Sequence, residues 1–193
     1  KRFTYRHNDI ESMEKNLQRA TKLATETGGG ILFITEGVFG MRGQQGKLKE
    51  VGAMKQKYNF RLLVDDAHGF GTLGKTGAGA GEEQGVQEDI DVYFSTFAKS
   101  MANIGTFVAA NKDIIDYLKY NMRSQMFAKS LPMIQTIGSL KRLQMLRDNP
   151  GLKDKLWENV NVLQNGLRTK GFNIGDTNTC VTPVYLEGSV PEA

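Results

Sequence analysis

The chain has 193 residues, of which 39% are hydrophobic, and a formal net charge of +4 at pH 7. This composition places it among globular proteins with a buried core, and its single cysteine excludes a disulfide framework and a zinc site built from cysteine pairs. No apolar run approaches the length of a membrane span and no signal peptide is recognisable, which favours a reducing cytoplasm. The mildly basic charge suits an anionic substrate or cofactor, although basic residues scattered over solvated helix faces explain it more simply than nucleic-acid binding does.

The first predicted element is a helix over residues 10–27, whose apolar positions recur at helical spacing. Asn8 or Asp9 can cap its start, because a short side-chain oxygen there accepts a free backbone N–H of the first turn. Gly28-Gly-Gly30 ends it. The elements expected next are a strand over 31–35, a turn-rich loop over 37–46, a helix over 48–58 and a strand over 61–64.

Residues 69–76 match the phosphate-binding P-loop, G-x-x-x-x-G-K-T, and also the dinucleotide pattern G-x-G-x-x-G. Both patterns require a helix directly afterwards, because its N-terminus binds the phosphates. Residues 77–85 instead hold four glycines, and each glycine inside a helix costs about 1 kcal/mol relative to alanine. We therefore expect no helix there and interpret the segment as a surface loop that crosses other backbone closely.

Two further apolar strands are expected over residues 91–94 and 107–110. Apolar strands separated by helices indicate an α/β fold with a mostly parallel sheet covered by helices on both faces. The elements expected after them are helices over 113–121, 132–148 and 152–170, the last capped by Gly171, and the beginning of a strand over 180–186.

These elements divide the chain into three predicted parts. Residues 1–112 form the C-terminal half of a large α/β domain, residues 113–150 a helical connector, and residues 151–193 the start of a smaller C-terminal α+β domain. Because the sequence begins at Lys1 without a methionine and stops at Ala193 in what reads as a connection, we expect a central fragment of a longer polypeptide.

Polar side chains follow two of the strands. Asp65 ends one, and Thr96 and Lys99 lie just past another, with Lys99 34 residues beyond Asp65. Ligands of open α/β sheets bind beyond the carboxyl ends of the strands, so an aspartate and a lysine can face one ligand. Pyridoxal phosphate needs this pair, because a lysine forms a Schiff base with its aldehyde and an acid keeps its ring nitrogen protonated. Thr96 could then hold the phosphate and His68 the phenolic oxygen.

The same residues resemble the α-oxoamine synthases, pyridoxal-phosphate enzymes of fold type I. The most specific match is Val-Asp-Asp-Ala-His-Gly at 64–69, followed at this spacing by Thr-x-x-Lys at 96–99. The other matching segments are residues 7–9, 35–39, 74–85, 95–100, 123–124 and 127–132, so the resemblance covers essentially the whole chain.

Carried over position by position, the resemblance implies that Lys99 holds the cofactor covalently and carries the substrate α-proton. It makes Asp65 the partner of the pyridine nitrogen, and it places His68 at the phenolic oxygen and Thr96 at the phosphate. The reaction implied is a decarboxylative condensation of serine or glycine with an acyl-CoA. Segments 101–104 and 121–124 look most like serine palmitoyltransferase, and the resemblance also implies a homodimer without nucleic acid or an integral membrane segment.

Two departures leave alternatives open. The family usually has a serine at the position of Gly40 and an acidic residue at that of Arg42, so the substrate differs or the chain is a non-catalytic homologue that keeps the cofactor. Glycine C-acetyltransferase and 8-amino-7-oxononanoate synthase are the other activities considered. The resemblance also places a ring-stacking histidine before Lys1 and a carboxylate-binding arginine after Ala193, so we expect this chain alone to be inactive. Asp66, beside Asp65, is expected to cap a helix or to form a salt bridge.

Overall fold

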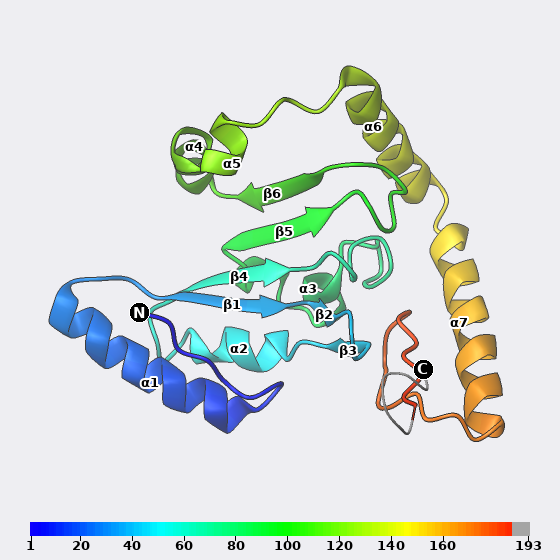
Figure 1. Cartoon of the computed structure of the whole chain (residues 1–193), viewed down its shortest axis with the longest axis horizontal. Coiled ribbons are helices and arrows are strands. Elements are labelled where there is room, and N and C mark those ends of the chain that lie inside the picture. Colours follow the sequence, from blue (N-terminus) through cyan, green and yellow to red (C-terminus); the bar gives the residue numbers. More distant parts are fainter. Residues whose placement is uncertain (187–193) are drawn as a thin grey trace.

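The computed structural model describes residues 1–186 and centres on a four-stranded sheet (Figure 1). The order of its strands is β1 (Leu32–Glu36), β4 (Arg61–Asp65), β5 (Val92–Thr96) and β6 (Thr106–Ala110). The first three are parallel and β6 runs antiparallel to β5. A separate two-stranded hairpin, β2 (Val38–Phe39) and β3 (Gln44–Gln45), lies within the loop predicted over 37–46. The strands predicted over 31–35, 61–64, 91–94 and 107–110 are therefore confirmed, with ends that differ by at most two residues.

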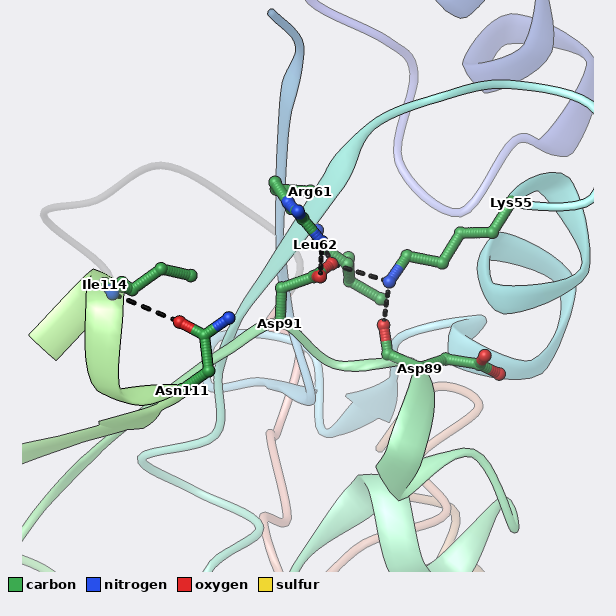
Figure 2. Close-up of polar contacts among 7 residues, drawn as sticks. All are labelled: Lys55, Arg61, Leu62, Asp89, Asp91, Asn111 and Ile114. Atoms are coloured by element: carbon green, nitrogen blue, oxygen red, sulfur yellow. Dashed lines mark hydrogen bonds and ion pairs between the residues drawn. The ribbon is translucent and has the colours of Figure 1, made fainter.

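Local signals explain where two of the helices begin. Asp9 accepts a hydrogen bond from the Ser12 amide at 2.8 Å and caps α1 (Ile10–Thr27), which ends at Gly28 with φ of 68°. Asn111 accepts one from the Ile114 amide at 3.1 Å and caps α4 (Lys112–Asn121; Figure 2). The other helices are α2 (Leu48–Met54), α3 (Ala80–Glu83), the 3-10 helix η1 (Gln87–Asp89), α5 (Arg123–Met126), α6 (Met133–Asp148) and α7 (Gly151–Thr169).

The hydrophobic core lies between the sheet and the helices α1 and α2, which cover one of its faces (Figure 1). Met13 and Leu17 of α1 pack in one cluster with Val51 of α2 and with Leu62 and Val64 of β4, all buried. Burying a side chain of this size contributes about 1.5 to 3 kcal/mol before entropy is counted. The side chains of β1 alternate between this core and the other face of the sheet, where Leu32 and Ile34 are more than half exposed among the described residues.

A buried carboxylate joins the amino ends of β4 and β5 (Figure 2). Asp91 accepts hydrogen bonds from Lys55 Nζ at 2.6 Å, from Arg61 Nη1 at 2.8 Å and from the Leu62 amide at 2.7 Å. Burial raises the pKa of Asp91, but these hydrogen bonds outweigh it and hold the pKa below the usual value. The register of the two strands that lead to the candidate site is thus fixed at the opposite end of the sheet.

The predicted helix over 48–58 is wrong at its C-terminal end. The α-helix stops at Met54, and the chain continues to Tyr58 in turns with hydrogen bonds from Gln56 N to Ala53 O and from Lys57 N to Met54 O. Hydrogen bonds between residues three apart, as in a 3-10 helix, tighten the end of an α-helix. Lys55, the C-cap residue of α2, donates to Asp91, a contact that the helical pattern of the sequence does not show.

The prediction of no helix after Thr76 is also wrong in part. One helical turn, α3, follows Gly79, but it starts four residues after Thr76, and Gly79 has φ of 109°, which no other residue type adopts easily. The loop is therefore not a P-loop. It does cross other backbone closely, because a Cβ on Gly77 would lie 3.5 Å from Gly71 Cα.

The strand predicted over 180–186 is wrong, since these residues form no strand. Within this range the Tyr185 amide donates to Asn173 O, and just before it Thr177 and Thr179 donate to the carbonyl oxygen of Gly43. A strand requires a neighbouring strand for its backbone hydrogen bonds, and none lies beside it in the described part of the chain. Helix α5 is an element that the sequence did not predict. Residues 187–193 lie outside the described range.

Helices α6 and α7 run along the side of the sheet toward which the parallel strands point (Figure 1). Trp157 of α7 donates a hydrogen bond from Nε1 to Thr72 O at 2.8 Å, which ties this helix to the loop after β4. Asn103 Nδ2, in the loop after β5, donates to Gln135 O and Ser139 Oγ of α6, both at 2.7 Å. Among residues 1–186, no helix combines the length and apolar character needed to cross a membrane.

Candidate active site

The carboxyl end of β4 turns sharply and carries two of the predicted site residues. Asp65, its last residue, pairs with Phe94 of β5, and its Oδ1 accepts a hydrogen bond from the Ala67 amide at 3.0 Å. The amides of Gly69 and Phe70 then donate to Asp66 O, at 3.1 and 2.9 Å. This turn brings His68 back toward the end of the sheet, and both Asp65 and His68 are half-buried.

The carboxyl end of β5 carries the other two. Thr96, its last residue, donates a hydrogen bond from Oγ1 to Gly105 O at 3.0 Å and accepts one from the Ala98 amide at 3.1 Å. The loop from there to β6 closes on itself, since the Phe97 amide also donates to Gly105 O, at 2.9 Å. Lys99 lies in this loop and is exposed.

The structure brings His68 and Lys99 into the lining of one cavity of about 540 Å³. Asp65 and Thr96 do not line this cavity, so the four residues occupy two adjoining strand ends and do not form a single wall. Leu146 of α6 and Leu156 of α7 supply apolar surface on the other side. A site here would thus combine polar groups from strand ends with an apolar wall, which is common for small-molecule pockets.

The pKa of His68 is affected by three charged side chains around the candidate site. Burial lowers its pKa, the Lys99 ammonium lowers it further, and the carboxylates of Glu36 and Asp65 act in the opposite direction. The net result is a pKa below the ordinary histidine value, which leaves the ring neutral at physiological pH. These influences also mean that Lys99, Glu36 and Asp65 all lie within electrostatic range of one imidazole.

Gly40 lies directly against His68. A Cβ on Gly40 would lie 2.3 Å from Nε2 of His68 and 2.9 Å from its Cε1. The imidazole therefore occupies the space that a side chain at position 40 would need. Arg42, two residues on, is exposed in the turn between β2 and β3.

Two polar residues beside the site were missed or left undecided by the sequence analysis. Ser100 lines the same cavity as Lys99, and its buried Oγ has no hydrogen-bond partner among the described residues. In the sequence, only the position of Ser100 directly after Lys99 could have indicated that it belongs to the site. Asp66 forms no salt bridge with any of residues 1–186, but its Oδ2 accepts a hydrogen bond from the amide of Ala80, the first residue of α3. Asp66 thus binds an amide at the start of α3 from outside the helix, whose own N-cap residue, Gly79, makes no side-chain cap hydrogen bond.

Comparison with known proteins gives a consistent picture. The family model for aminotransferase class I and II matches residues 1–188. A cysteate-C-fatty acyltransferase of Capnocytophaga ochracea is 72% identical over 100% of the chain and 46% of its own length. A serine palmitoyltransferase of Bacteroides ovatus is 37% identical over 94% of the chain and 45% of its own length. The chain thus spans about half the length of the curated relatives it matches.

The solved structures agree with the sequence matches. A serine palmitoyltransferase from S. paucimobilis, with a bound PLP-myriocin aldimine, has a TM-score of 0.86 and 32% identity over 96% of this chain and 47% of that one. This likeness confirms the predicted fold, that of fold type I pyridoxal-phosphate transferases. The resemblance to the α-oxoamine synthases is likewise confirmed by the serine palmitoyltransferases and by an 8-amino-7-oxononanoate synthase of Geobacter metallireducens at 36% identity over 96% of the chain and 46% of its own length.

Proposed function

Because the chain belongs to the aminotransferase class I and II family, we propose that the full-length protein is a pyridoxal-phosphate-dependent acyltransferase. It condenses a small amino acid with an acyl thioester, such as an acyl-CoA, and releases the free thiol, carbon dioxide and an α-aminoketone. The observation that carries this proposal is the 72% identity to a cysteate-C-fatty acyltransferase, which extends over the whole chain.

The donor set at the strand ends supports the cofactor. Asp65 uses Oδ1 for the Ala67 amide, which leaves Oδ2 to accept a hydrogen bond from a protonated pyridine nitrogen. Lys99 is exposed beside a cavity, as an amine that bonds to an aldehyde must be. The neutral ring of His68 can donate a hydrogen bond to a phenolic oxygen. The bound cofactor would supply an electron sink that stabilises negative charge at the substrate α-carbon.

Thr96 fits its expected role less directly. Its hydroxyl donates to Gly105 O and accepts from the Ala98 amide, so it must exchange the first of these hydrogen bonds in order to donate to a phosphate. We therefore propose that Thr96 contacts the phosphate after its hydroxyl releases Gly105 O. Ser100, whose Oγ is buried without a partner among the described residues, is another hydroxyl beside Lys99 and lines the same cavity.

Each side chain has a stated task in the proposed reaction. Lys99 Nζ would hold the cofactor covalently at rest, and, once the substrate amine has replaced it there, the freed amine would remove the proton from the substrate α-carbon. Asp65 keeps the positive charge on the ring nitrogen, and His68 orients the ring through its phenolic oxygen. The apolar surface of Leu146 and Leu156 excludes water from the side of the cavity opposite the polar groups.

We favour cysteate over serine or glycine as the amino acid. The cysteate-C-fatty acyltransferase is 72% identical to this chain, whereas the serine palmitoyltransferase of B. ovatus is 37% identical. Arg42 stands where the α-oxoamine synthases usually have an acidic residue, and a guanidinium is suited to a sulfonate, whereas a carboxylate would repel it. Gly40, which gives His68 its space, is the second departure in the same turn.

The protein is further proposed to act as a homodimer in the cytoplasm. Large apolar side chains on α4, α5 and α6 are exposed among the described residues, including Tyr120 at 77% and Phe127 at 75%. Patches of this kind are usually covered by another subunit or by the rest of the chain. The single cysteine suits a reducing compartment. The mass of the full-length protein in solution tests the dimer.

The activity is tested with the full-length protein, its cofactor and a long-chain acyl-CoA. Thiol release and carbon dioxide release are measured together with cysteate, serine and glycine in turn, in wild type and in Lys99→Ala. The proposal expects both products to appear in equal amounts, fastest with cysteate, and to vanish in Lys99→Ala. A wild-type protein that binds the cofactor but releases neither product with any of the three would instead be a non-catalytic homologue.

A further inference from the structure

Asp66 is the most deeply buried carboxylate beside the candidate site, with 0% of the residue exposed. Its Oδ2 accepts two hydrogen bonds, from the Ala80 amide at 2.9 Å and from Tyr93 Oη at 3.0 Å. Its Oδ1 has no hydrogen-bond partner among the described residues. A carboxylate with no cation beside it is costly to bury, so its presence here calls for a role beyond packing.

Three glycines from three separate segments surround this carboxylate. A Cβ on Gly37 or on Gly69 would lie 2.1 Å from Oδ1, and one on Gly79 would lie 1.8 Å from Oδ2. These glycines belong to the connection after β1, the turn after β4 and the loop before α3. The carboxylate is thus the common contact of three loops at one end of the sheet. This packing accounts for Gly69, the first glycine of the P-loop-like segment, without phosphate binding.

The backbone of Asp66 is held as firmly as its side chain. Its amide donates to Phe94 O at 2.8 Å, and its carbonyl oxygen accepts from Ser95 Oγ at 3.3 Å and from the amides of Gly69 and Phe70. Asp66 therefore connects the turn after β4 to β5 through both its main chain and its carboxylate. Asp65 precedes it directly and His68 follows two residues later.

We propose that Asp66 is a positioning residue of the candidate active site: its carboxylate holds the turn after β4 so that Asp65 and His68 keep their places relative to Thr96 and Lys99. The ligand for which this geometry matters, pyridoxal phosphate, rests on the proposed function. Asp66 itself does not touch it. Active-site groups are usually held in place by such supporting hydrogen bonds, whose loss loosens the site without removing any contacting group.

The charges around Asp66 agree with this role. Burial raises its pKa to about 6, and the hydrogen bonds from Ala80 and Tyr93 only partly oppose that. The two ionisable groups that act on it are Asp65 on its own segment and Tyr93 on β5. Burial raises the pKa of Tyr93 most, and the negative charge of Asp66 raises it further. Tyr93 therefore keeps its hydroxyl proton and donates a hydrogen bond throughout the physiological pH range.

The test compares Asp66→Ala and Asp66→Asn with Glu82→Ala in the full-length protein. Glu82 binds the same glycine loop through the amides of Thr76 and Ala78, and none of its hydrogen bonds in the described part of the chain goes to the turn that carries Asp65 and His68. Glu82→Ala therefore controls for a general loosening of the loop. Asn can still accept both hydrogen bonds through its carbonyl oxygen, so Asp66→Asn is the conservative replacement.

Two readouts are measured at a temperature at which every variant is folded. The first is amide hydrogen exchange of peptides spanning residues 65–70 in the protein without cofactor. The second is the dissociation constant for pyridoxal phosphate per folded molecule. We expect faster exchange and a dissociation constant raised by at least about tenfold in Asp66→Ala, and values within about threefold of wild type in Asp66→Asn and Glu82→Ala.

The proposal is overturned if Asp66→Ala matches Glu82→Ala in both readouts, because Asp66 would then only stabilise the fold. Failure to rescue by Asp66→Asn contradicts it too, since the accepted hydrogen bonds would not be what matters. A wild-type protein without affinity for pyridoxal phosphate would remove the proposed function instead, and the exchange of residues 65–70 would still decide whether Asp66 holds the turn.

Discussion

The imidazole of His68 fills the space beside Gly40: a Cβ at position 40 would lie 2.3 Å from its Nε2. The backbone of Gly40 is not in a left-handed conformation, so only this side chain excludes a larger residue. His68 is also the group whose pKa responds to Lys99, Glu36 and Asp65. Glycine at position 40 is thus linked to the placement of a residue at the centre of the candidate site.

Gly40→Ala is expected to displace His68 and to leave the fold intact, because the imidazole can turn away while the backbone keeps its conformation. We expect activity with the amino acid to fall by about tenfold to a hundredfold, the usual cost of misplacing an active-site group by about an ångström. The thermal midpoint should change little. Gly30→Ala is the matched control, since nothing lies within 4 Å of its Cβ. Equal activity of the two variants contradicts the link between position 40 and His68.

Asp91→Ala is expected to destabilise the sheet. Its carboxylate is mostly buried and binds Lys55, Arg61 and the Leu62 amide, and leaving such partners unpaired costs about 2 to 4 kcal/mol. Because the folded pKa of Asp91 lies below 3.8, this stabilisation is complete above the unfolded pKa and is lost as pH falls through the folded pKa. Urea unfolding of wild type and variant should therefore differ at pH 7 and converge below about pH 4.

Asp66 has the opposite pH dependence. Its folded pKa is about 6, above the ordinary 3.8, so the folded state binds the proton more tightly than the unfolded state does. Stability should then fall as pH rises between these values, by up to about 3 kcal/mol. Asp66→Asn lacks this titration. The unfolding free energy of wild type minus that of Asp66→Asn should decrease from pH 4 to pH 7, and a difference independent of pH would contradict the burial of an ionisable carboxyl.

Local signals in the sequence predicted much of the fold. The helix over 10–27 was predicted to the residue, because Asp9 and Gly28 set its ends by hydrogen bonds and backbone conformation that depend on neighbours only. The strand over 180–186 was not, because a strand depends on a partner that sequence cannot supply. The end of α2 was not predicted either, because the helical pattern continues to Tyr58 whereas the chain turns after Met54. The division at 112/113 and 150/151 stays a prediction.

The candidate site was predictable to a similar degree. Asp65, His68, Thr96 and Lys99 lie in two short motifs at strand ends, where polar residues after apolar runs are visible in the sequence. The apolar wall was not predictable, since Leu146 and Leu156 come from α6 and α7, far along the chain from the strand ends that they face. Asp66 was undecided because only the packing of Gly37, Gly69 and Gly79 reveals what its carboxylate holds.

Arg42→Asp tests the proposed preference for cysteate. This change restores the acidic residue usual at this position in the α-oxoamine synthases and replaces attraction of a sulfonate by repulsion. We expect kcat/KM for cysteate to fall by at least about tenfold relative to that for serine, which corresponds to the loss of about 1.4 kcal/mol of discrimination. Lys47→Asp, an exposed change of equal charge in the next loop, controls for net charge. The same ratio of cysteate to serine activity in both variants would exclude Arg42 from substrate recognition.

The central claim is that Lys99 holds pyridoxal phosphate, and borohydride reduction tests it most directly. Reduction of the cofactor-loaded full-length protein makes the bond between amine and cofactor permanent, and peptide mass analysis then locates it. We predict the added phosphopyridoxyl mass on the peptide that contains Lys99, and its absence in Lys99→Ala. The same mass on a different lysine, or no added mass in a protein that binds the cofactor, would contradict the account.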